Sequence, residues 1–333
     1  MTAVLSVHGL TIEATTGLGP VKLVHDVNLD LHEGEILGLI GESGSGKSTA
    51  VRSMIGLLER NVRVSSGEIA LRGEVISSES VNHFEGVRGS EIGMIFQSAA
   101  MSLNPLMKVG KQLREVVRRH QKHASAKEID QRLELVLRKM GFTDTDRVLG
   151  AFPHQLSGGM RQRIAIGLAI VTEPAVVIAD ECTSALDVTT QAEVVKLLRT
   201  LTSESRTAML FVTHDLMLAK DICSQIAVMY AGEIVETGEA NELIDNPRHP
   251  YTRALLQAIP TWGTDELQGI EGSPPPVAAD WQGCRFAPRC PLARDECRQQ
   301  NVGWTRLGDR SGARCVVVQE EEVRIPDSVL GHA

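Results

Sequence analysis

The chain has 333 residues, of which 42% are hydrophobic and 23% charged, and its 34 Lys plus Arg against 42 Asp plus Glu give a formal net charge of −8. This composition is typical of a globular protein with about two domains. The acidic balance and the 3% aromatic content argue against a protein that mainly binds nucleic acid. No apolar run reaches the ~18 residues that span a bilayer, and residues 1–13 lack the pattern of a signal peptide. We therefore expect a cytosolic protein whose six cysteines stay reduced unless they bind a metal.

Three short apolar runs, each followed by a polar or glycine-rich turn, predict buried strands. They cover residues 36–40, 176–179 and 209–212. Continuous apolar strands are typical of a parallel sheet that is covered on both faces, and such sheets bind ligands at the carboxyl ends of their strands. The sequence therefore predicts an α/β core with its functional residues directly after these runs.

Residues 98–170, between the first two runs, predict helices instead. Ser125 and Glu128 have the spacing of a capping box, and apolar residues then recur at helical spacing up to Gly141. We expect a helical subdomain inserted into the core. Further along, residues 226–230 and 233–236 predict a hairpin with its turn at Ala231-Gly232.

The composition changes after about residue 261. Residues 272–276, Gly-Ser-Pro-Pro-Pro, form an extended connector, and four of the six cysteines follow between Cys284 and Cys315. Residues 320–333 are expected to form a loosely ordered tail. We predict two domains, a core domain over residues 1–260 and a small cysteine-rich extension over residues 261–333.

A phosphate-binding loop, Gly-x4-Gly-Lys-Ser, directly follows the first predicted strand. In such a loop the backbone N–H groups surround the phosphates of a nucleotide, the lysine neutralises the β- and γ-phosphates, and the serine hydroxyl binds Mg²⁺. The residues predicted to bind ATP here are Gly41, Ser43, Gly44, Gly46, Lys47, Ser48 and Thr49.

An acidic pair follows the second predicted strand. Asp180 is suited to a water-mediated contact with Mg²⁺, and Glu181 to polarising the attacking water as general base, a role worth ~10²–10⁴ in rate. Upstream, Ser157, Gly158 and Gly159 open a helix and predict a second anion-binding end. One chain has little use for two such ends unless one of them serves a neighbouring subunit.

With these motifs the chain resembles the ATP-binding subunits of ABC transporters. The resemblance implies that the signature Leu156–Arg163 contacts the γ-phosphate of ATP on the opposing subunit. It implies that Gln97 is the Q-loop glutamine, which joins Ser48 and Asp180 at Mg²⁺, that Asp187 ends the D-loop, and that His214 is the switch histidine. A nucleoside kinase or GTPase shares the phosphate loop but has no use for the signature.

Gln155-Leu156 before the signature glycines and Met160 after them resemble the D-type subunit of the oligopeptide/dipeptide importer subfamily. Several other segments resemble this subfamily as a whole. They are residues 94–97, 102–105, 152–155 and 246–256 and the cysteine region. The resemblance implies a peripheral subunit on the cytoplasmic face of the inner or plasma membrane. Its implied partners are an F-type ATPase subunit in a heterodimer, two transmembrane permease subunits and an extracytoplasmic solute-binding protein, with no nucleic acid. Uptake of nickel, glutathione or oligosaccharides, and a soluble ABC ATPase acting on nucleic acid or ribosomes, are the alternatives.

Four cysteines, Cys284, Cys290, Cys297 and Cys315, indicate a metal site. Their spacing lacks the paired C-x2-4-C ligands of structural zinc, whereas four thiolates suit an iron–sulfur cluster. Seven Arg against three Asp/Glu lie between Cys284 and Cys315, so we expect guanidinium groups to stabilise an anionic cluster. The resemblance implies a 4Fe–4S cluster here; zinc and unliganded thiols are the alternatives.

The chain departs from the family pattern at three places. Cys182 stands where proline usually follows the catalytic glutamate, and Ser98-Ala99 replaces the usual Asp-Pro, without loss of a reactive group. The family's adenine-stacking aromatic is missing, and Ala14 or Leu18 lies about where it belongs. We expect adenine binding to be weaker by the ~1–3 kcal/mol of a base–aromatic stack, or to rely on aliphatic contact.

Overall fold

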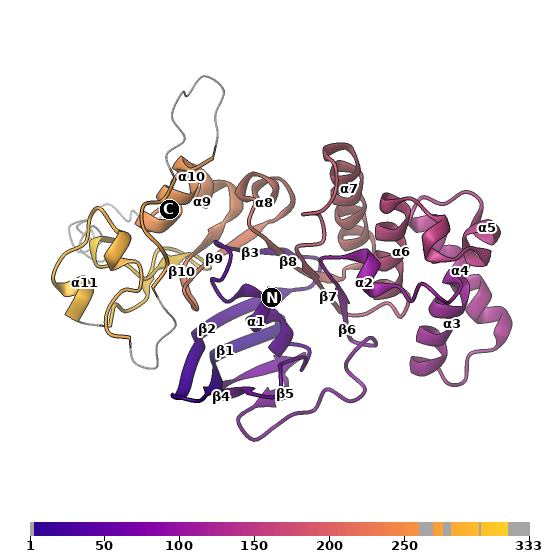
Figure 1. Ribbon diagram of the computed structural model, residues 1–333, viewed down its shortest axis with the longest axis horizontal. Helices are drawn as coiled ribbons and strands as arrows, with labels where there is room; N and C mark the ends of the chain where they lie inside the picture. The colour runs from indigo at the N-terminus through magenta and orange to yellow at the C-terminus, as the bar shows by residue number, and fades with distance from the viewer. Residues whose placement is uncertain (1–2, 260–268, 276–280, 300, 319–333) are drawn as a thin grey trace, which may run out of the picture.

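Two β-sheets form the centre of the molecule in the computed structural model, which describes residues 3–259, 269–275, 281–299 and 301–318 (Figure 1). The smaller sheet is antiparallel with the strand order β2-β1-β4-β5. Its strands are β1 (Ala3–Thr16), β2 (Gly19–His32), β4 (Val62–Leu71) and β5 (Glu74–Ser78). The apolar face of this sheet packs with one face of the larger sheet in a shared hydrophobic core.

The larger sheet has the order β11-β12-β10-β9-β3-β8-β7-β6. Its strands are β3 (Ile36–Ile40), β6 (Ile92–Ile95), β7 (Val176–Asp180), β8 (Ala208–Thr213), β9 (Gln225–Tyr230), β10 (Glu233–Glu239), β11 (Thr305–Arg306) and β12 (Gly312–Ala313). Strands β9, β3, β8, β7 and β6 are parallel neighbours. The three strands predicted from apolar runs are confirmed as β3, β7 and β8, and every residue in them is buried.

The helices lie around the larger sheet and beyond its β6 edge. The α-helices are α1 (Lys47–Ser53), α2 (Ala99–Ser102), α3 (Val109–His120), α4 (Ala126–Lys139), α5 (Thr145–Gly150), α6 (Gly158–Ile170), α7 (Val188–Ser205), α8 (Leu216–Ile222), α9 (Ala240–Asp245), α10 (Pro250–Gln257) and α11 (Glu296–Gln299). Two 3-10 turns are η1 (Pro153–Gln155) and η2 (Ala287–Arg289). In the described part of the chain, none of these helices has both the length and the apolar character to cross a bilayer.

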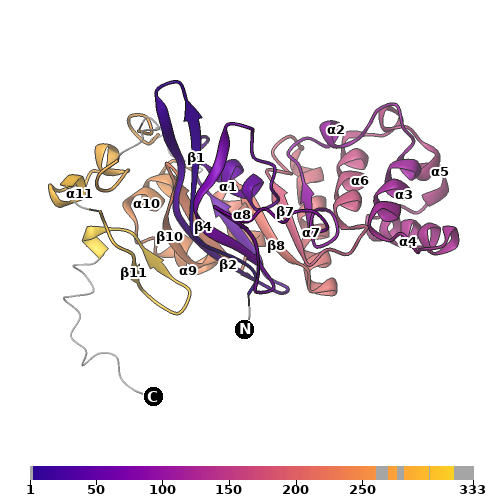
Figure 2. The same ribbon diagram turned by 90° about the horizontal axis from the view of Figure 1, so that it is seen from below.

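Helices α2 to α6 are consecutive between β6 and β7 and gather at one end of the molecule (Figures 1 and 2). The helix predicted from the capping box is confirmed as α4. Glu128 N–H donates to Ser125 Oγ at 3.3 Å, and Ser125 N–H donates to Glu128 Oε2 at 2.7 Å. The hydrophobic core of these helices includes Leu113 of α3, Leu133 of α4 and Ile164 of α6, each with an exposed fraction of 0%.

The predicted hairpin is confirmed as β9–β10. Its turn residues Ala231 and Gly232 have φ values of +46° and +91°, in the left-handed region that a tight hairpin turn requires. Gly232 N–H donates to Ser45 O at 2.8 Å, so this turn lies directly against the phosphate loop.

The cysteine-rich extension joins the edge of the larger sheet. Strand β12 pairs antiparallel with β10, with Glu236 opposite Ala313. The predicted connector is described only up to Pro275, without regular structure, and the boundary at residue 261 and the tail at 320–333 lie outside the described residues.

Four arginines of the extension form ion pairs with carboxylates of the core. These pairs are Arg285–Glu233 at 3.0 Å, Arg289–Glu42 at 2.8 Å, Arg310–Glu35 at 2.7 Å and Arg314–Asp26 at 3.0 Å. The expectation that the guanidinium groups serve a thiolate cluster is therefore wrong for these four. Ionised carboxylates with two acceptor oxygens are the stronger partners, and here they hold the extension to the core.

Candidate nucleotide-binding site

The phosphate loop connects β3 to α1, and glycine is required at two of its positions. A Cβ atom on Gly41 would lie 2.1 Å from the carbonyl oxygen of Met229, inside any permitted contact. Gly46 has φ +101°, which L-residues rarely adopt, and it directly precedes the first helical residue, Lys47. The sequence pattern therefore fixes the path of the loop between the sheet and the helix.

Lys47 is ordered by the loop itself. Its Nζ donates to Gly41 O at 2.7 Å and to Glu42 O at 2.9 Å, and the residue is 4% exposed. Burial lowers the pKa of Lys47, while the negative charges of Glu181 and Asp180 act in the opposite direction. A lysine ammonium held in a glycine-containing loop, next to two carboxylates, suits a nucleotide phosphate bound together with a divalent metal.

Ser48 and Asp180, predicted to bind Mg²⁺, are brought together although 132 residues separate them. Ser48 Oγ donates to Asp180 Oδ1 at 3.4 Å. Burial, followed by the neighbouring charge of Glu181, raises the pKa of Asp180. A hydroxyl and a carboxylate are the oxygen ligands that Mg²⁺ prefers, and the bound cation would favour the ionised carboxylate.

Glu181 is the centre of a second group of predicted residues. Gln97 Nε2 donates to Glu181 Oε2 at 3.2 Å and lies 3.4 Å from Ser184 Oγ, while His214 Nδ1 lies 3.7 Å from Glu181 Oε1. Glu181 has φ +46°, an uncommon conformation for a residue with a side chain. Its N–H donates to Val212 O at 3.0 Å, which holds this turn against the end of β8.

The signature opens α6. Ser157 caps this helix, accepting a hydrogen bond from Met160 N–H at 3.2 Å. Asp187 caps α7 through two hydrogen bonds from Thr190, which lower the pKa of Asp187. Within the described ranges, no hydrogen bond or ion pair joins residues 157–159 to the phosphate loop of the same chain. The predicted role of this end toward a neighbouring subunit stays a prediction.

The sequence analysis missed three residues that support the site. Gln162 in α6 donates from Nε2 to Cys182 O at 2.7 Å, in a buried contact that joins the signature helix to the residue after Glu181. Tyr251 accepts a hydrogen bond from Glu42 N–H at 2.9 Å, and Arg289 binds the Glu42 carboxylate. The position of Gln162 within the signature was a usable sequence signal, whereas Tyr251 and Arg289 lie more than 200 residues from the loop.

Of the two residues near the expected adenine-stacking position, only one is exposed. Ala14 is 8% exposed and lies inside β1, paired with Val21 and Val62. Leu18, in the turn between β1 and β2, is fully exposed. Aliphatic contact with a base is therefore available from Leu18 and not from Ala14.

The four cysteines of the extension share one neighbourhood without forming a metal site in this structure. Cys284 N–H donates to Cys297 O at 2.7 Å, and burial, with the charges of Cys315 and Cys297, raises the pKa of Cys284 to about 12. The described residues include all four cysteines, yet no three His, Cys, Asp or Glu side chains among them are arranged to hold a metal ion. The donor chemistry suits a metal, but this arrangement of the thiols does not.

The parallel sheet, the phosphate loop and the acidic pair at the ends of β3 and β7 define a P-loop ATPase. The ABC transporter family matches residues 24–184, and the C-terminal region of oligopeptide/dipeptide transporters matches residues 235–297. The chain is 38% identical over 330 residues to the oligopeptide transport ATP-binding protein AppD of Bacillus subtilis, covering 96% of this chain and 98% of that protein. The chain therefore belongs to the ATP-binding proteins of ABC transporters, within their oligopeptide/dipeptide group.

Two further comparisons agree with this membership. The dipeptide transport ATP-binding protein DppD of Escherichia coli is 38% identical over 315 residues, covering 94% of this chain and 96% of that protein. A solved dimeric, post-hydrolysis structure of the ATP-binding cassette MJ0796, bound to ADP and phosphate, superposes with a TM-score of 0.61 at 28% identity, covering 71% of this chain and 98% of that chain. The predicted ABC ATPase fold and the predicted ATP binding are thereby confirmed.

Proposed function

We propose that this chain is the ATP-hydrolysing motor subunit of an importer for dipeptides or oligopeptides, at the cytoplasmic face of the membrane. The observation that carries the proposal is the match of residues 235–297 to the C-terminal region of oligopeptide/dipeptide transporters, beside the phosphate loop, the acidic pair and the signature. The relatives that align over nearly the whole chain are ATP-binding proteins of oligopeptide and dipeptide transport, which also supports the proposal.

The residue roles of the motor are part of this proposal. Mg²⁺ is bound by Ser48, Asp180 and Gln97, and Glu181 is the general base beside His214. The phosphates of ATP are bound by Gly41, Ser43, Gly44, Gly46, Lys47, Ser48 and Thr49. The hydrogen bond from Gln97 to Glu181 and the contact of Ser48 with Asp180 support these roles. Residues 157–159 and Asp187 bind ATP held by the opposing ATPase subunit, which is an F-type subunit in a heterodimer.

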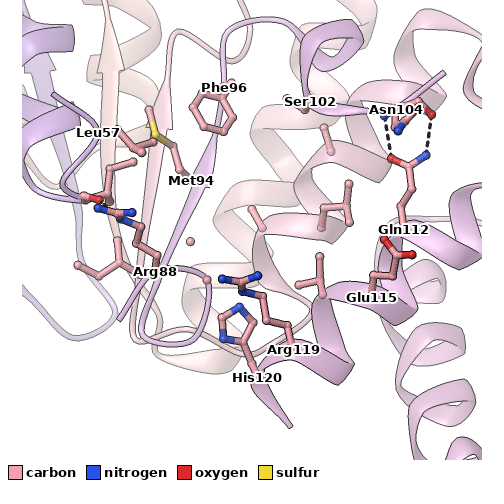
Figure 3. Close-up of a pocket in the computed structure, with 18 of the residues that line it drawn as sticks. Leu57, Arg88, Met94, Phe96, Ser102, Asn104, Gln112, Glu115, Arg119 and His120 are labelled. Atoms are coloured by element: carbon pink, nitrogen blue, oxygen red, sulfur yellow. Dashed lines mark hydrogen bonds between the residues drawn. The ribbon is translucent and has the colours of Figure 1, made fainter. Parts of the chain in front are cut away.

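A groove between the sheet and the inserted helices is the proposed contact with one of two permease subunits. Its volume is about 910 Å³. Figure 3 shows Met94 and Phe96, from β6 and the turn after it, on one side of the groove and Glu115 and Arg119 of α3 on the other. Phe96 is 41% exposed and directly precedes Gln97, so a segment seated here lies beside a residue that touches the catalytic glutamate.

Replacing Phe96 with Asp tests this contact, and Leu292→Asp in the extension is the matched control. Leu292 is 45% exposed, similar to Phe96, and shortly precedes α11. Helix α11 lies at the opposite end of the molecule from the inserted helices α3 to α6 (Figure 1). We expect Phe96→Asp to lose co-purification with the permeases while Leu292→Asp keeps it. Equal retention by both variants would place the contact elsewhere.

The domain division and the metal also belong to the proposal. Residues 1–260 form the nucleotide-binding domain with the helical subdomain at 98–170, and residues 261–333 form the extension. Burial, followed by the nearby charges of Cys315 and Cys297, raises the pKa of Cys284 and of Cys290. This proximity of the four cysteines supports binding of an iron–sulfur cluster, with zinc as the alternative, after rearrangement of their side chains. Iron and zinc analysis of anaerobically purified protein, with Cys290→Ser beside it, tests this; absence of both metals would contradict it.

The transport function is tested by ATP hydrolysis in the four-subunit complex with its solute-binding protein. Dipeptides, longer peptides, Ni²⁺, glutathione and oligosaccharides are supplied in turn. We expect stimulation by peptides of one length class. Stimulation only by a non-peptide would retain the motor and overturn the peptide assignment.

A further inference from the structure

Arg289 of the extension reaches the phosphate loop, and all five of its N–H donors form hydrogen bonds. Its two terminal nitrogens donate to both oxygens of Glu42, at 2.8 and 3.2 Å. The remaining hydrogen bonds go to Tyr230 Oη at 3.3 Å and to the carbonyl oxygens of Ile270 and Glu271 at 3.1 and 2.9 Å. The Arg289 side chain is only 4% exposed, so this planar fork is fixed rather than free in solvent.

Glu42 is the second residue of the phosphate loop and is held at three points. Its N–H donates to Tyr251 Oη at 2.9 Å, its carbonyl oxygen accepts from Lys47 Nζ at 2.9 Å, and its carboxylate binds Arg289. Both Tyr251 and Arg289 lie beyond residue 250, outside the conventional nucleotide motifs. The C-terminal part of the chain therefore orders the loop from outside.

The charge of Glu42 is unfavourable for binding ATP unless it is paired. Its carboxylate belongs to a loop that must surround an anionic triphosphate, and it is near enough to Lys47 to affect the pKa of that lysine. A carboxylate without a partner would repel the phosphates and compete with them for the Lys47 ammonium. A bidentate guanidinium both neutralises it and fixes its orientation.

We propose that Arg289 is a positioning residue for the nucleotide site, which neutralises Glu42 and so makes the ATP affinity of the phosphate loop depend on the docked C-terminal extension. The inference rests on ATP binding, which family membership establishes, and not on the transported solute. Failure of the peptide assignment would leave it unaffected.

Strand β3 supplies a matched control. At its amino end Glu35 forms a second bidentate pair with an arginine of the extension, Arg310, at 2.7 and 3.1 Å. At its carboxyl end the chain enters the phosphate loop and reaches Glu42. Arg289→Met and Arg310→Met thus remove the same kind of contact between extension and core, but only the first lies at the phosphates.

The test measures equilibrium binding of MgATP to the full chain, and KM and kcat for ATP in the assembled transporter. We expect Arg289→Met to raise Kd and KM at least about fivefold, the lower end of typical coupling between linked sites. The kcat of Arg289→Met should stay within about twofold of the wild-type value. For Arg310→Met, the Kd for MgATP should also stay within about twofold of wild type. Glu42→Gln, introduced into Arg289→Met, should return Kd to within about twofold of wild type because it removes the unpaired charge.

Two results would overturn the proposal. One is an unchanged Kd in folded Arg289→Met; the other is equal weakening by Arg289→Met and Arg310→Met with no rescue by Glu42→Gln, which indicates a merely structural contact. Thermal unfolding checks that each variant folds. If Arg289→Met does not fold, Glu42→Gln alone decides: affinity equal to or above wild type supports the proposal, and weaker binding contradicts it.

Discussion

The side-chain amide of Gln97 donates a hydrogen bond to the carboxylate of Glu181 across 84 residues of sequence, at a distance of 3.2 Å. Gln97 follows β6 and Glu181 follows β7, two parallel neighbours whose carboxyl ends meet at the same edge of the sheet. Residue 96, directly before Gln97, lines the groove proposed for the permease. The proposed permease contact at Phe96 is thus connected to the proposed general base, Glu181, through the adjacent Gln97 and its hydrogen bond.

The first prediction concerns Glu181. Glu181→Gln should bind ATP but hydrolyse it ~10²–10⁴-fold more slowly, because the amide keeps the shape of the side chain but cannot accept a proton from water. ATPase assays of the assembled transporter, with nucleotide binding measured in parallel, check this. Glu193→Gln, on the exposed surface of α7, is the control and should retain full activity. Near-normal turnover in Glu181→Gln would place the base elsewhere.

The second prediction concerns the Gln97–Glu181 contact. Gln97→Ala should reduce kcat and weaken the response of hydrolysis to solute, while ATP affinity changes less, because Lys47 and the loop remain intact. Basal and solute-stimulated ATPase rates measure the two effects separately. Gln121→Ala, at the end of α3 and away from Glu181, serves as the control. Unaltered stimulation in Gln97→Ala would show that this contact does not carry the signal.

The third prediction is a pH dependence of stability at His249. This residue caps α10, accepting from Tyr251 N–H at 3.0 Å, and burial lowers its pKa to about 3. An unfolded histidine gains its proton near pH 6.5, so the contribution of neutral His249 is complete above that pH. It should be lost as the pH falls from about 6.5 toward 3, by about 1.4 kcal/mol per pH unit.

Denaturant unfolding at several pH values measures this slope. His249→Asn keeps an acceptor that can cap the helix but does not titrate, and should show a smaller loss of stability between pH 6.5 and 5 than wild type. His123→Asn, which changes an exposed residue, should not alter the slope. Identical slopes in wild type and His249→Asn would contradict the assignment.

The parts predicted from sequence are those that local pattern determines. Strands β3, β7 and β8 are continuous apolar segments because both faces are covered, and α4 carries its own capping box. The smaller sheet was not predicted: β1 and β2 pair with several register shifts, which interrupt the regular alternation that marks a half-buried strand.

The ion pairs between extension and core could not be predicted for a different reason. Arg289 and Glu42 are 247 residues apart, and neither belongs to a local pattern that names its partner. The count of arginines around the cysteines was correct, but it gave no information on which anions they meet. The pairing of β12 with β10, which no local pattern in the sequence indicates, brings the extension alongside the β9–β10 hairpin.

The last prediction concerns the base of the nucleotide. Leu18 is fully exposed in the turn between β1 and β2, near the position where the resemblance to the family led us to expect an adenine-stacking aromatic residue. Leu18→Tyr should tighten ATP binding by up to the ~1–3 kcal/mol that a base–aromatic stack supplies, without raising kcat, because the added contact is remote from the phosphates. Ala14→Tyr should instead destabilise the fold, because Ala14 is buried between two paired strands. Equilibrium binding of ATP and of a base-free triphosphate separates the two contributions, and equal effects of Leu18→Tyr on both ligands would rule out stacking at this turn.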